Sequence, residues 1–220
     1  MMKSGRCLLW LLCLWLTTSC NVLPERPNWC SDEGLCSGNL LFVRAVDTVG
    51  MEAAIAASTG TYTHVAVLEY ADSQYYVIEA TPRLGVVRRP LDQFFEEIWL
   101  QDSSVSPLTY VDFYYLVEET DIPALMERLH SHLGEPYDDA FLPDNGRMYC
   151  SELVYECVKD REGRPVFEAN PMNFKGADER IHPYWQAHFD SLGVAVPQGV
   201  PGTNPTDMSR SERLHRFKIE

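Results

Sequence analysis

The sequence predicts an α+β domain in which an antiparallel sheet packs against helices. Two β-rich runs, 63–70 and 74–80, are separated by Ala71-Asp72-Ser73, which is the signature of a β-hairpin. Further segments carry apolar residues at helical spacing, at 90–99, 121–134 and 150–159. With 220 residues, of which 45% are hydrophobic, the chain is long enough for one well-packed domain of this class.

The predicted elements before residue 100 are short. The apolar run 39–46 predicts a strand, the segment 51–57 predicts a small helix, and the two strands of the hairpin follow. Pro90 then opens a helix that extends to residue 99, because proline suits the first turn. The apolar side chains of this helix share one face: Leu91, Phe94, Phe95 and Ile98.

The second half predicts one strand and two longer helices. Tyr, Phe and Val enrich 109–117, which favours a strand. Asp121 caps a helix that ends at Gly134, and Cys150 begins a helix that extends to residue 159. Beyond about residue 190 the chain is rich in Gly and Pro, and we expect packing on the body of the domain, rather than elements of its own, to order it.

The first residues predict an export signal. Lys3 and Arg6 precede the apolar run 7–16, which is too short to cross a bilayer as a helix, for which about 20 residues are needed. The residues before Cys20 resemble a bacterial lipobox, although Thr17 stands where Leu is more usual. We therefore expect a signal peptide at 1–19, a lipidated Cys20, a tether at 20–37 and a hydrolase domain at 38–220. The alternative is a plain secreted protein in which Cys20 is incidental.

The charge pattern restricts the partners. The formal net charge is −14 and the sequence contains no Lys/Arg-rich run, which argues against a nucleic-acid partner. Anionic headgroups would repel so acidic a body, so membrane attachment would depend on the acyl chains. Asn21 follows Cys20 in place of the Asp that retains some lipoproteins in the inner membrane, so we expect a bacterial envelope protein anchored in the outer membrane.

Export also affects the interpretation of two cysteines. Cys30 and Cys36 lie close together in a polar stretch, and an oxidising compartment favours a disulfide between them over two free thiols. A zinc site is not expected, because no second pair of ligands stands at zinc-finger spacing. The histidines elsewhere also form no ligand spacing, so we expect neither a catalytic metal nor a cofactor.

Cys150 is the candidate nucleophile. It stands where a polar loop meets an amphipathic helix, and a helix N-terminus stabilises a thiolate through its dipole and its unpaired N–H groups. The alternative is a buried structural cysteine, which describes Cys157 better.

His64 and Glu79 are the candidate partners of this thiol. Each is a polar residue inside an apolar strand, where it needs a partner. If the hairpin loop has two or four residues, both side chains project from one face, and Glu79 can orient the imidazole. A core histidine bonded to the backbone, or a Glu79 that faces water, is the alternative.

The ordered motifs resemble one known family. The segments Gly38-Asn39-Leu40-Leu41-Phe42, Thr63-His64-Val65-Ala66-Val67, Val77-Ile78-Glu79-Ala80 and Tyr149-Cys150-Ser151-Glu152-Leu153 are similar to the permuted papain-like amidases of the YiiX/YebB type, in the NlpC/P60 superfamily. The resemblance covers roughly residues 37–215. It implies a circularly permuted papain-like fold and a Cys–His–Glu triad at Cys150, His64 and Glu79. Asn39 departs from the Asp usual in the first motif.

The resemblance implies an exported cysteine hydrolase that cleaves an amide bond through an acyl-enzyme. Its expected substrate is a peptide, a peptidoglycan fragment, an amino-acid amide or an N-acyl amino compound. Tyr149 either lines the site or packs on the sheet. Two alternatives remain open, a lipid-directed thioesterase or acyltransferase and a non-catalytic binding lipoprotein.

Overall fold

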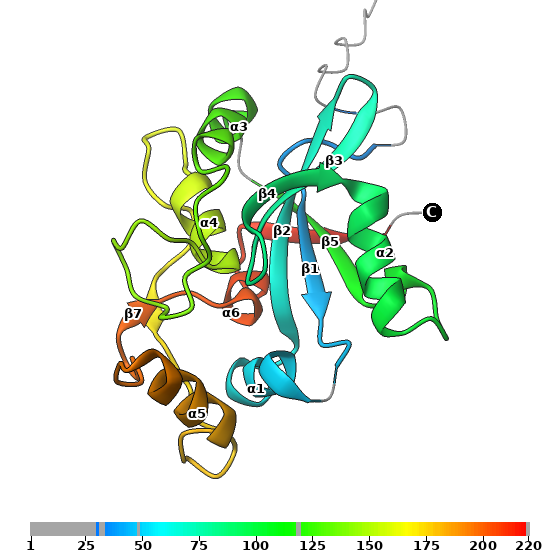
Figure 1. Ribbon diagram of the computed structural model, residues 1–220. Helices are drawn as coiled ribbons and strands as arrows, with labels where there is room; N and C mark the ends of the chain where they lie inside the picture. The colour runs from blue at the N-terminus through cyan, green and yellow to red at the C-terminus, as the bar shows by residue number, and fades with distance from the viewer. Residues whose placement is uncertain (1–29, 31–33, 48, 118–119, 219–220) are drawn as a thin grey trace, which may run out of the picture.

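The computed structural model describes residues 30, 34–47, 49–117 and 120–218. Its centre is a six-stranded antiparallel sheet with the strand order β4-β3-β2-β1-β5-β8 (Figure 1). The strands are β1 (Leu40–Arg44), β2 (Tyr62–Ala71), β3 (Gln74–Thr81), β4 (Gly85–Pro90), β5 (Val111–Leu116) and β8 (Leu214–Phe217). The α+β class with an antiparallel sheet and packed helices is therefore confirmed. The expected signal peptide and Cys20 lie outside the described residues.

Helices cover the two faces of the sheet unequally (Figure 1). One face packs on α2 (Leu91–Gln101), which inserts Phe94 and Ile98 into the smaller hydrophobic core. The larger core, on the other face, receives side chains from the remaining helices. These are α1 (Gly50–Thr59), α3 (Ile122–Ser131), α4 (Cys150–Cys157), α5 (Pro183–Leu192) and α6 (Pro205–Ser209). None of the described helices is long and apolar enough to cross a membrane.

The hairpin between β2 and β3 turns through two residues. Ala71 pairs with Gln74, and Asp72 and Ser73 between them both have positive φ, at 51° and 60°. This left-handed pair suits a tight hairpin turn whose twist matches that of the strands. The register that follows pairs Val67 with Ile78, and therefore places His64 and Glu79 on the same side of the hairpin.

The regions for which the sequence predicted no elements contain several. The strand β4 adds an edge to the hairpin, and α5 packs Trp185 and Phe189 into the larger core. The C-terminal segment forms α6 and then β8, which pairs with β5. A two-stranded sheet of β6 (Asn170–Pro171) and β7 (Pro201–Gly202) and a 3-10 turn, η1 (Pro107–Thr109), complete the elements. The expectation of a C-terminal region without elements was therefore wrong.

A disulfide joins Cys30 to Cys36 just before β1. Within the loop it closes, Leu35 is buried, as is Ser37 directly after it. Among the described residues, burial against the domain is therefore present from Leu35 onward.

Candidate active site

The hairpin brings the predicted base and its partner into direct contact. Nε2 of His64 lies 2.5 Å from Oε2 of Glu79, whose side chain is only 1% exposed. A bulge between β1 and β2 lies beside His64, since Val43 pairs with His64 while Arg44 pairs with Tyr62. Bulges of this kind re-aim side chains next to active sites. The alternative in which Glu79 faces water does not apply in this structure.

The nucleophile candidate reaches the other side of the imidazole. Cys150 is the first residue of α4, is buried, and lies close enough to the side chain of His64 to raise the pKa of the imidazole. Since Nε2 of His64 faces Glu79, Nδ1 is the ring nitrogen left for the thiol. Cys157, the other free cysteine, lies on the same helix inside the larger core.

The electrostatics favour a protonated imidazole beside two acidic partners. Burial alone would lower the pKa of His64, but the hydrogen bonds to Cys150 and Glu79 raise it to about 10. Burial alone would raise the pKa of Glu79, but the hydrogen bond and charge of His64, followed by Arg89, hold it below its ordinary value. Burial raises the pKa of the Cys157 thiol to about 12, so that this cysteine stays unreactive.

Hydrogen bonds with Glu152 and Thr203 hold the start of α4. The backbone N–H of Tyr149, the N-cap residue, donates to Oε2 of Glu152 at 3.3 Å. Burial raises the pKa of Glu152 to about 8. The Tyr149 hydroxyl accepts a hydrogen bond from the Thr203 backbone N–H at 3.1 Å, and Thr203 Oγ1 bonds Ser151 Oγ at 3.1 Å. The segment before α6 therefore fixes both neighbours of Cys150.

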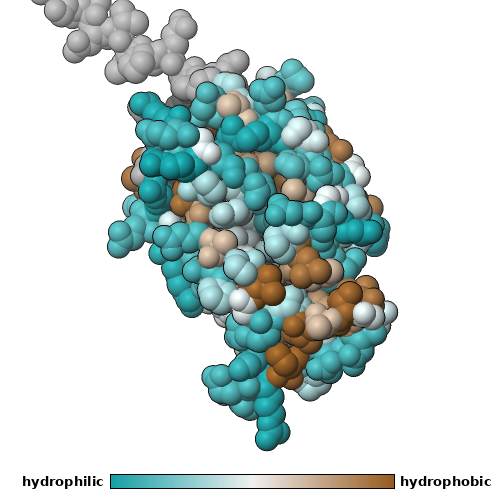
Figure 2. Space-filling view, turned by 90° about the vertical axis from the view of Figure 1, so that its left-hand side faces the viewer, coloured by the Kyte–Doolittle hydropathy of each residue, from teal (hydrophilic) through white to brown (hydrophobic). Residues whose placement is uncertain are grey.

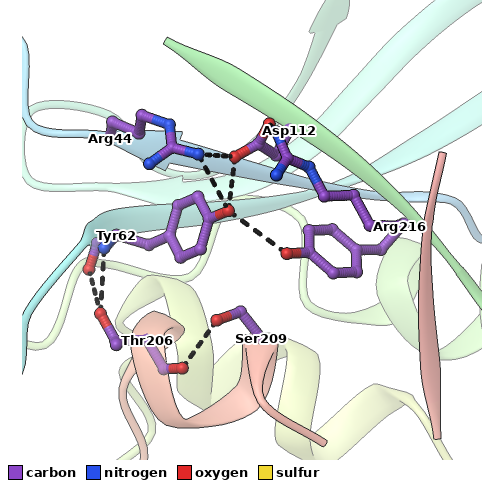
Figure 3. Close-up of polar contacts among 7 residues, drawn as sticks. Arg44, Tyr62, Asp112, Thr206, Ser209 and Arg216 are labelled. Carbon is purple, nitrogen blue, oxygen red and sulfur yellow. Dashed lines mark hydrogen bonds and ion pairs between the residues drawn. The ribbon is translucent and has the colours of Figure 1, made fainter. Parts of the chain in front are cut away.

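The same C-terminal segment also fixes the strand that carries His64. The Thr206 hydroxyl accepts a hydrogen bond from the Tyr62 N–H at 2.9 Å and donates one to the Tyr62 carbonyl at 3.1 Å (Figure 3). The Tyr62 side chain in turn donates to Asp112, which is bound by Arg44 and Arg216 (Figure 3). This network ties β2 to β1, β5 and β8 next to the site.

A small pocket opens against the thiol. Its volume is about 50 Å³, and Cys150 forms part of its wall. Most of the bulky lining is apolar or aromatic: Ile55, Tyr137, Phe141, Tyr149, Met172, Phe174 and Trp185. On the face of the molecule that carries α3, α4 and α5, hydrophobic side chains gather in the lower half, at the height of α5 (Figure 2). The predicted role of Tyr149 as a lining residue stays a prediction, but its position at this wall is consistent with it.

Sequence reasoning missed two residues that the fold brings to the site. Arg89, on β4, contacts Glu79 from the side opposite His64. Tyr137 lines the pocket next to Cys150; burial, and after it the charge of Cys150, raise the pKa of its hydroxyl well above the ordinary value. No local pattern distinguishes either residue, because β4 has the sequence GVVRRP without alternation and Tyr137 lies in a loop.

These features define a class. A histidine hydrogen-bonded to a glutamate lies beside a cysteine that begins a helix and follows the histidine in the chain. This is the arrangement of a cysteine hydrolase with permuted papain-like order. The chain belongs to the family described as "Permuted papain-like amidase enzyme, YaeF/YiiX, C92 family", whose family model matches residues 35–217. The cysteine-hydrolase class and the amidase or peptidase-like nature of the enzyme follow from this membership.

A solved structure supports the fold. The crystal structure described as the metalloprotein yiiX from Escherichia coli O157:H7 superposes with a TM-score of 0.66 at 22% identity, over 84% of this chain and 97% of that one. The search of curated proteins found no match. No group of three or more His, Cys, Asp or Glu side chains that could hold a metal ion occurs among the described residues.

Proposed function

We propose that the protein is a cysteine amidase that uses Cys150 as nucleophile, His64 as acid and base, and Glu79 to orient His64. The observation that carries the proposal is the hydrogen bond between His64 and Glu79, with Cys150 close enough to His64 to raise the pKa of the imidazole and forming part of the wall of a pocket. Each residue type suits its role, because a thiolate attacks carbonyls and an imidazole held by a carboxylate can give and take a proton.

The reaction has two stages. The Cys150 sulfur attacks the amide carbonyl, the C–N bond breaks, and His64 gives its proton to the leaving amine. His64, now neutral, takes a proton from water, which attacks the thioester and releases the acid and the thiol. The Cys150 backbone N–H at the start of α4 is one donor for the oxyanion. The Tyr137 hydroxyl, in the same pocket wall, is the candidate second donor.

The pocket favours an amide with a compact apolar acyl part. Its volume of about 50 Å³ has room for a few water-sized groups next to the thiol. Its aromatic walls favour an apolar substituent next to the scissile carbonyl. Peptides, peptidoglycan fragments and N-acyl amino compounds all meet this description.

A thiol-reactivity assay tests the nucleophile without a known substrate. Iodoacetamide at pH 7 is expected to label Cys150 in the wild type, and labelling should fall at least tenfold in His64→Ala. Cys157→Ser is the matched control, because this thiol is on the same helix and is expected to contribute no labelling. Equal labelling of Cys150 in the wild type and in His64→Ala would contradict the proposal.

A substrate screen tests the reaction. Wild type and Cys150→Ala are incubated with separate pools of muropeptides, of N-acyl amino acids, and of long-chain thioesters and lipids, and products are identified by mass spectrometry. Product formed only by the wild type supports the amidase. Turnover of long-chain thioesters or lipids alone would favour a lipid-directed thioesterase or acyltransferase. If the folded, reduced protein turns over none of these pools and its Cys150 stays unlabelled, a non-catalytic binding lipoprotein is favoured.

We further propose that the mature protein begins at a lipidated Cys20 and is anchored in the bacterial outer membrane. The support is the sequence pattern of a short apolar run, small residues, Cys20 and Asn21. Metabolic labelling with palmitate should mark the wild type and not Cys20→Ala, and membrane fractionation of the two should differ in the same way. Unlabelled wild-type protein would contradict lipidation.

A further inference from the structure

The two oxygens of the Glu79 carboxylate serve different partners. Oε2 contacts His64 at 2.5 Å, whereas Oε1 accepts from Nε of Arg89 at 2.6 Å and lies 2.6 Å from Nη2 of the same guanidinium. Arg89 is 12% exposed and Glu79 is 1% exposed, so water screens this contact poorly. The carboxylate is therefore shared between two cations.

A charge count shows what this sharing achieves. A Cys150 thiolate, a His64 imidazolium and a Glu79 carboxylate would leave one uncompensated negative charge in a buried site. The guanidinium of Arg89 cancels it. Glu97, which contacts Nη1 of Arg89 at 2.6 Å, is 49% exposed, so its charge is screened by solvent and its contact chiefly orients the guanidinium.

We propose that Arg89 is a positioning residue that neutralises Glu79, so that the carboxylate orients His64 without holding its proton too tightly. The inference rests on the proposed function, because it assigns how the base of that reaction is tuned. The proton of His64 must leave for the amine and later return from water, and an imidazolium stabilised by an unshared buried carboxylate would give it up reluctantly.

The direction of the effect distinguishes this role from a structural one. The cations of His64 and Arg89 lie roughly 6–7 Å apart, the span of two hydrogen bonds and one carboxylate. If Arg89 neutralises Glu79, its removal leaves His64 easier to protonate, and the titration midpoint of His64 should rise by roughly one to two pH units. If Arg89 only supports the fold, its loss should loosen Glu79, and the midpoint should fall toward that of a free imidazole.

Few other charged groups act on His64. Its direct charged or titratable partners are Glu79 from β3 and Cys150 from α4, with Arg89 from β4 behind Glu79. Replacing Cys150 with serine removes the thiol from the titration and leaves the pair that the inference concerns.

The first experiment is an NMR titration of labelled histidine in the Cys150→Ser protein. Adding Arg89→Gln should raise the His64 midpoint by roughly one to two units, and adding Glu79→Gln should lower it. Arg88→Gln is the matched control, since Arg88 neighbours Arg89 but bonds Glu69 instead. A midpoint that is unchanged or lowered in Arg89→Gln, with the spectrum of a folded protein, would overturn the inference.

The second experiment is kinetic and uses a substrate from the screen. In Arg89→Gln the high-pH limb of kcat/KM should move to higher pH and kcat should fall about tenfold, the effect of a roughly one-unit shift. Arg89→Lys should retain most of kcat, and Glu79→Gln/Arg89→Gln should restore the position of the limb, because it removes both charges. If the high-pH limb of kcat/KM in the double variant lies no nearer to that of the wild type than the limb of Arg89→Gln does, the charge balance is contradicted.

The two proposals fail separately. If Cys150 proves not to be the nucleophile, the thiol labelling shows it, and the NMR titration still decides whether Arg89 neutralises Glu79. If the labelling succeeds and the titration moves the wrong way, only the role of Arg89 is lost.

Discussion

The hydroxyl of Thr206 joins two parts of the chain that lie far apart in sequence. It bonds both the N–H and the carbonyl of Tyr62 across a sequence separation of 144 residues, and both residues are buried. Thr206→Val keeps the shape of the side chain and removes only the hydroxyl. The variant therefore leaves a buried backbone donor and acceptor without this partner.

The expected cost follows from these two bonds. An unsatisfied buried polar group costs about 1–3 kcal/mol, so the loss of a partner for two such groups should lower the free energy of unfolding by about 2–6 kcal/mol. For a domain of this size, each kcal/mol lowers Tm by about 2–4 °C, so Tm should fall by about 4–24 °C. Because Tyr62 lies two residues before His64, kcat should also fall severalfold while KM stays nearly constant.

Urea denaturation followed by circular dichroism measures the free energy of unfolding, and calorimetry measures Tm. Ser209→Ala is the control, because the Ser209 hydroxyl bonds only the Thr206 carbonyl within α6, at 2.7 Å (Figure 3). It should cost clearly less than Thr206→Val. A Thr206→Val protein as stable as the wild type would refute the argument that this hydroxyl holds β2.

Three further predictions concern other parts of the fold. Gly85→Ala should destabilise severely in a thermal melt, because Gly85 has φ +73° and a Cβ there would lie 2.2 Å from the Glu135 carbonyl oxygen; an unchanged Tm would contradict this. Because the pKa of His64 is raised, its contribution to stability is complete below about pH 6.5 and is lost as the pH rises to about 10, so the difference in unfolding free energy between wild type and His64→Gln should shrink over that window. Reducing the disulfide of Cys30 should cost about 2 kcal/mol in urea denaturation, as expected for a short loop, with little effect on kcat.

The hairpin shows how much the sequence can predict. Two strand-like runs and a short polar break predicted the hairpin, but they placed His64 and Glu79 on one face only if the loop had two or four residues, since side chains alternate along a strand. The two-residue turn at Asp72 and Ser73 meets that condition. The helix that begins at Cys150 was also predictable, because its apolar stripe starts directly after a polar loop. The link between these parts came from family motifs rather than from spacing.

The missed elements depend on contacts that no local pattern reveals. In β4 the adjacent arginines, Arg88 and Arg89, hide the strand, since their partners Glu69 and Glu79 lie on other strands. The strand β8 has only four residues, too few for a recognisable pattern, and it is a strand because it pairs with β5. The helix α5, by contrast, could have been predicted from the sequence, because Pro183 suits a first helical turn and Trp185 and Phe189 stand one turn apart. Both aromatic side chains are buried in the structure.

The three site residues are held together by unequal means. His64 and Glu79 are 15 residues apart and are joined by one tight turn, so their contact is nearly a local property of the hairpin. The distance between Cys150 and His64 depends instead on how α4 is held against β2, and Thr203 and Thr206 bind those two elements. The distance between the proposed nucleophile and the proposed base is therefore the dimension of the site that a mutation changes most easily. Thr206→Val should accordingly act mainly on the thiol reactivity of Cys150 and only slightly on the titration midpoint of His64. Arg89→Gln should act mainly on the midpoint.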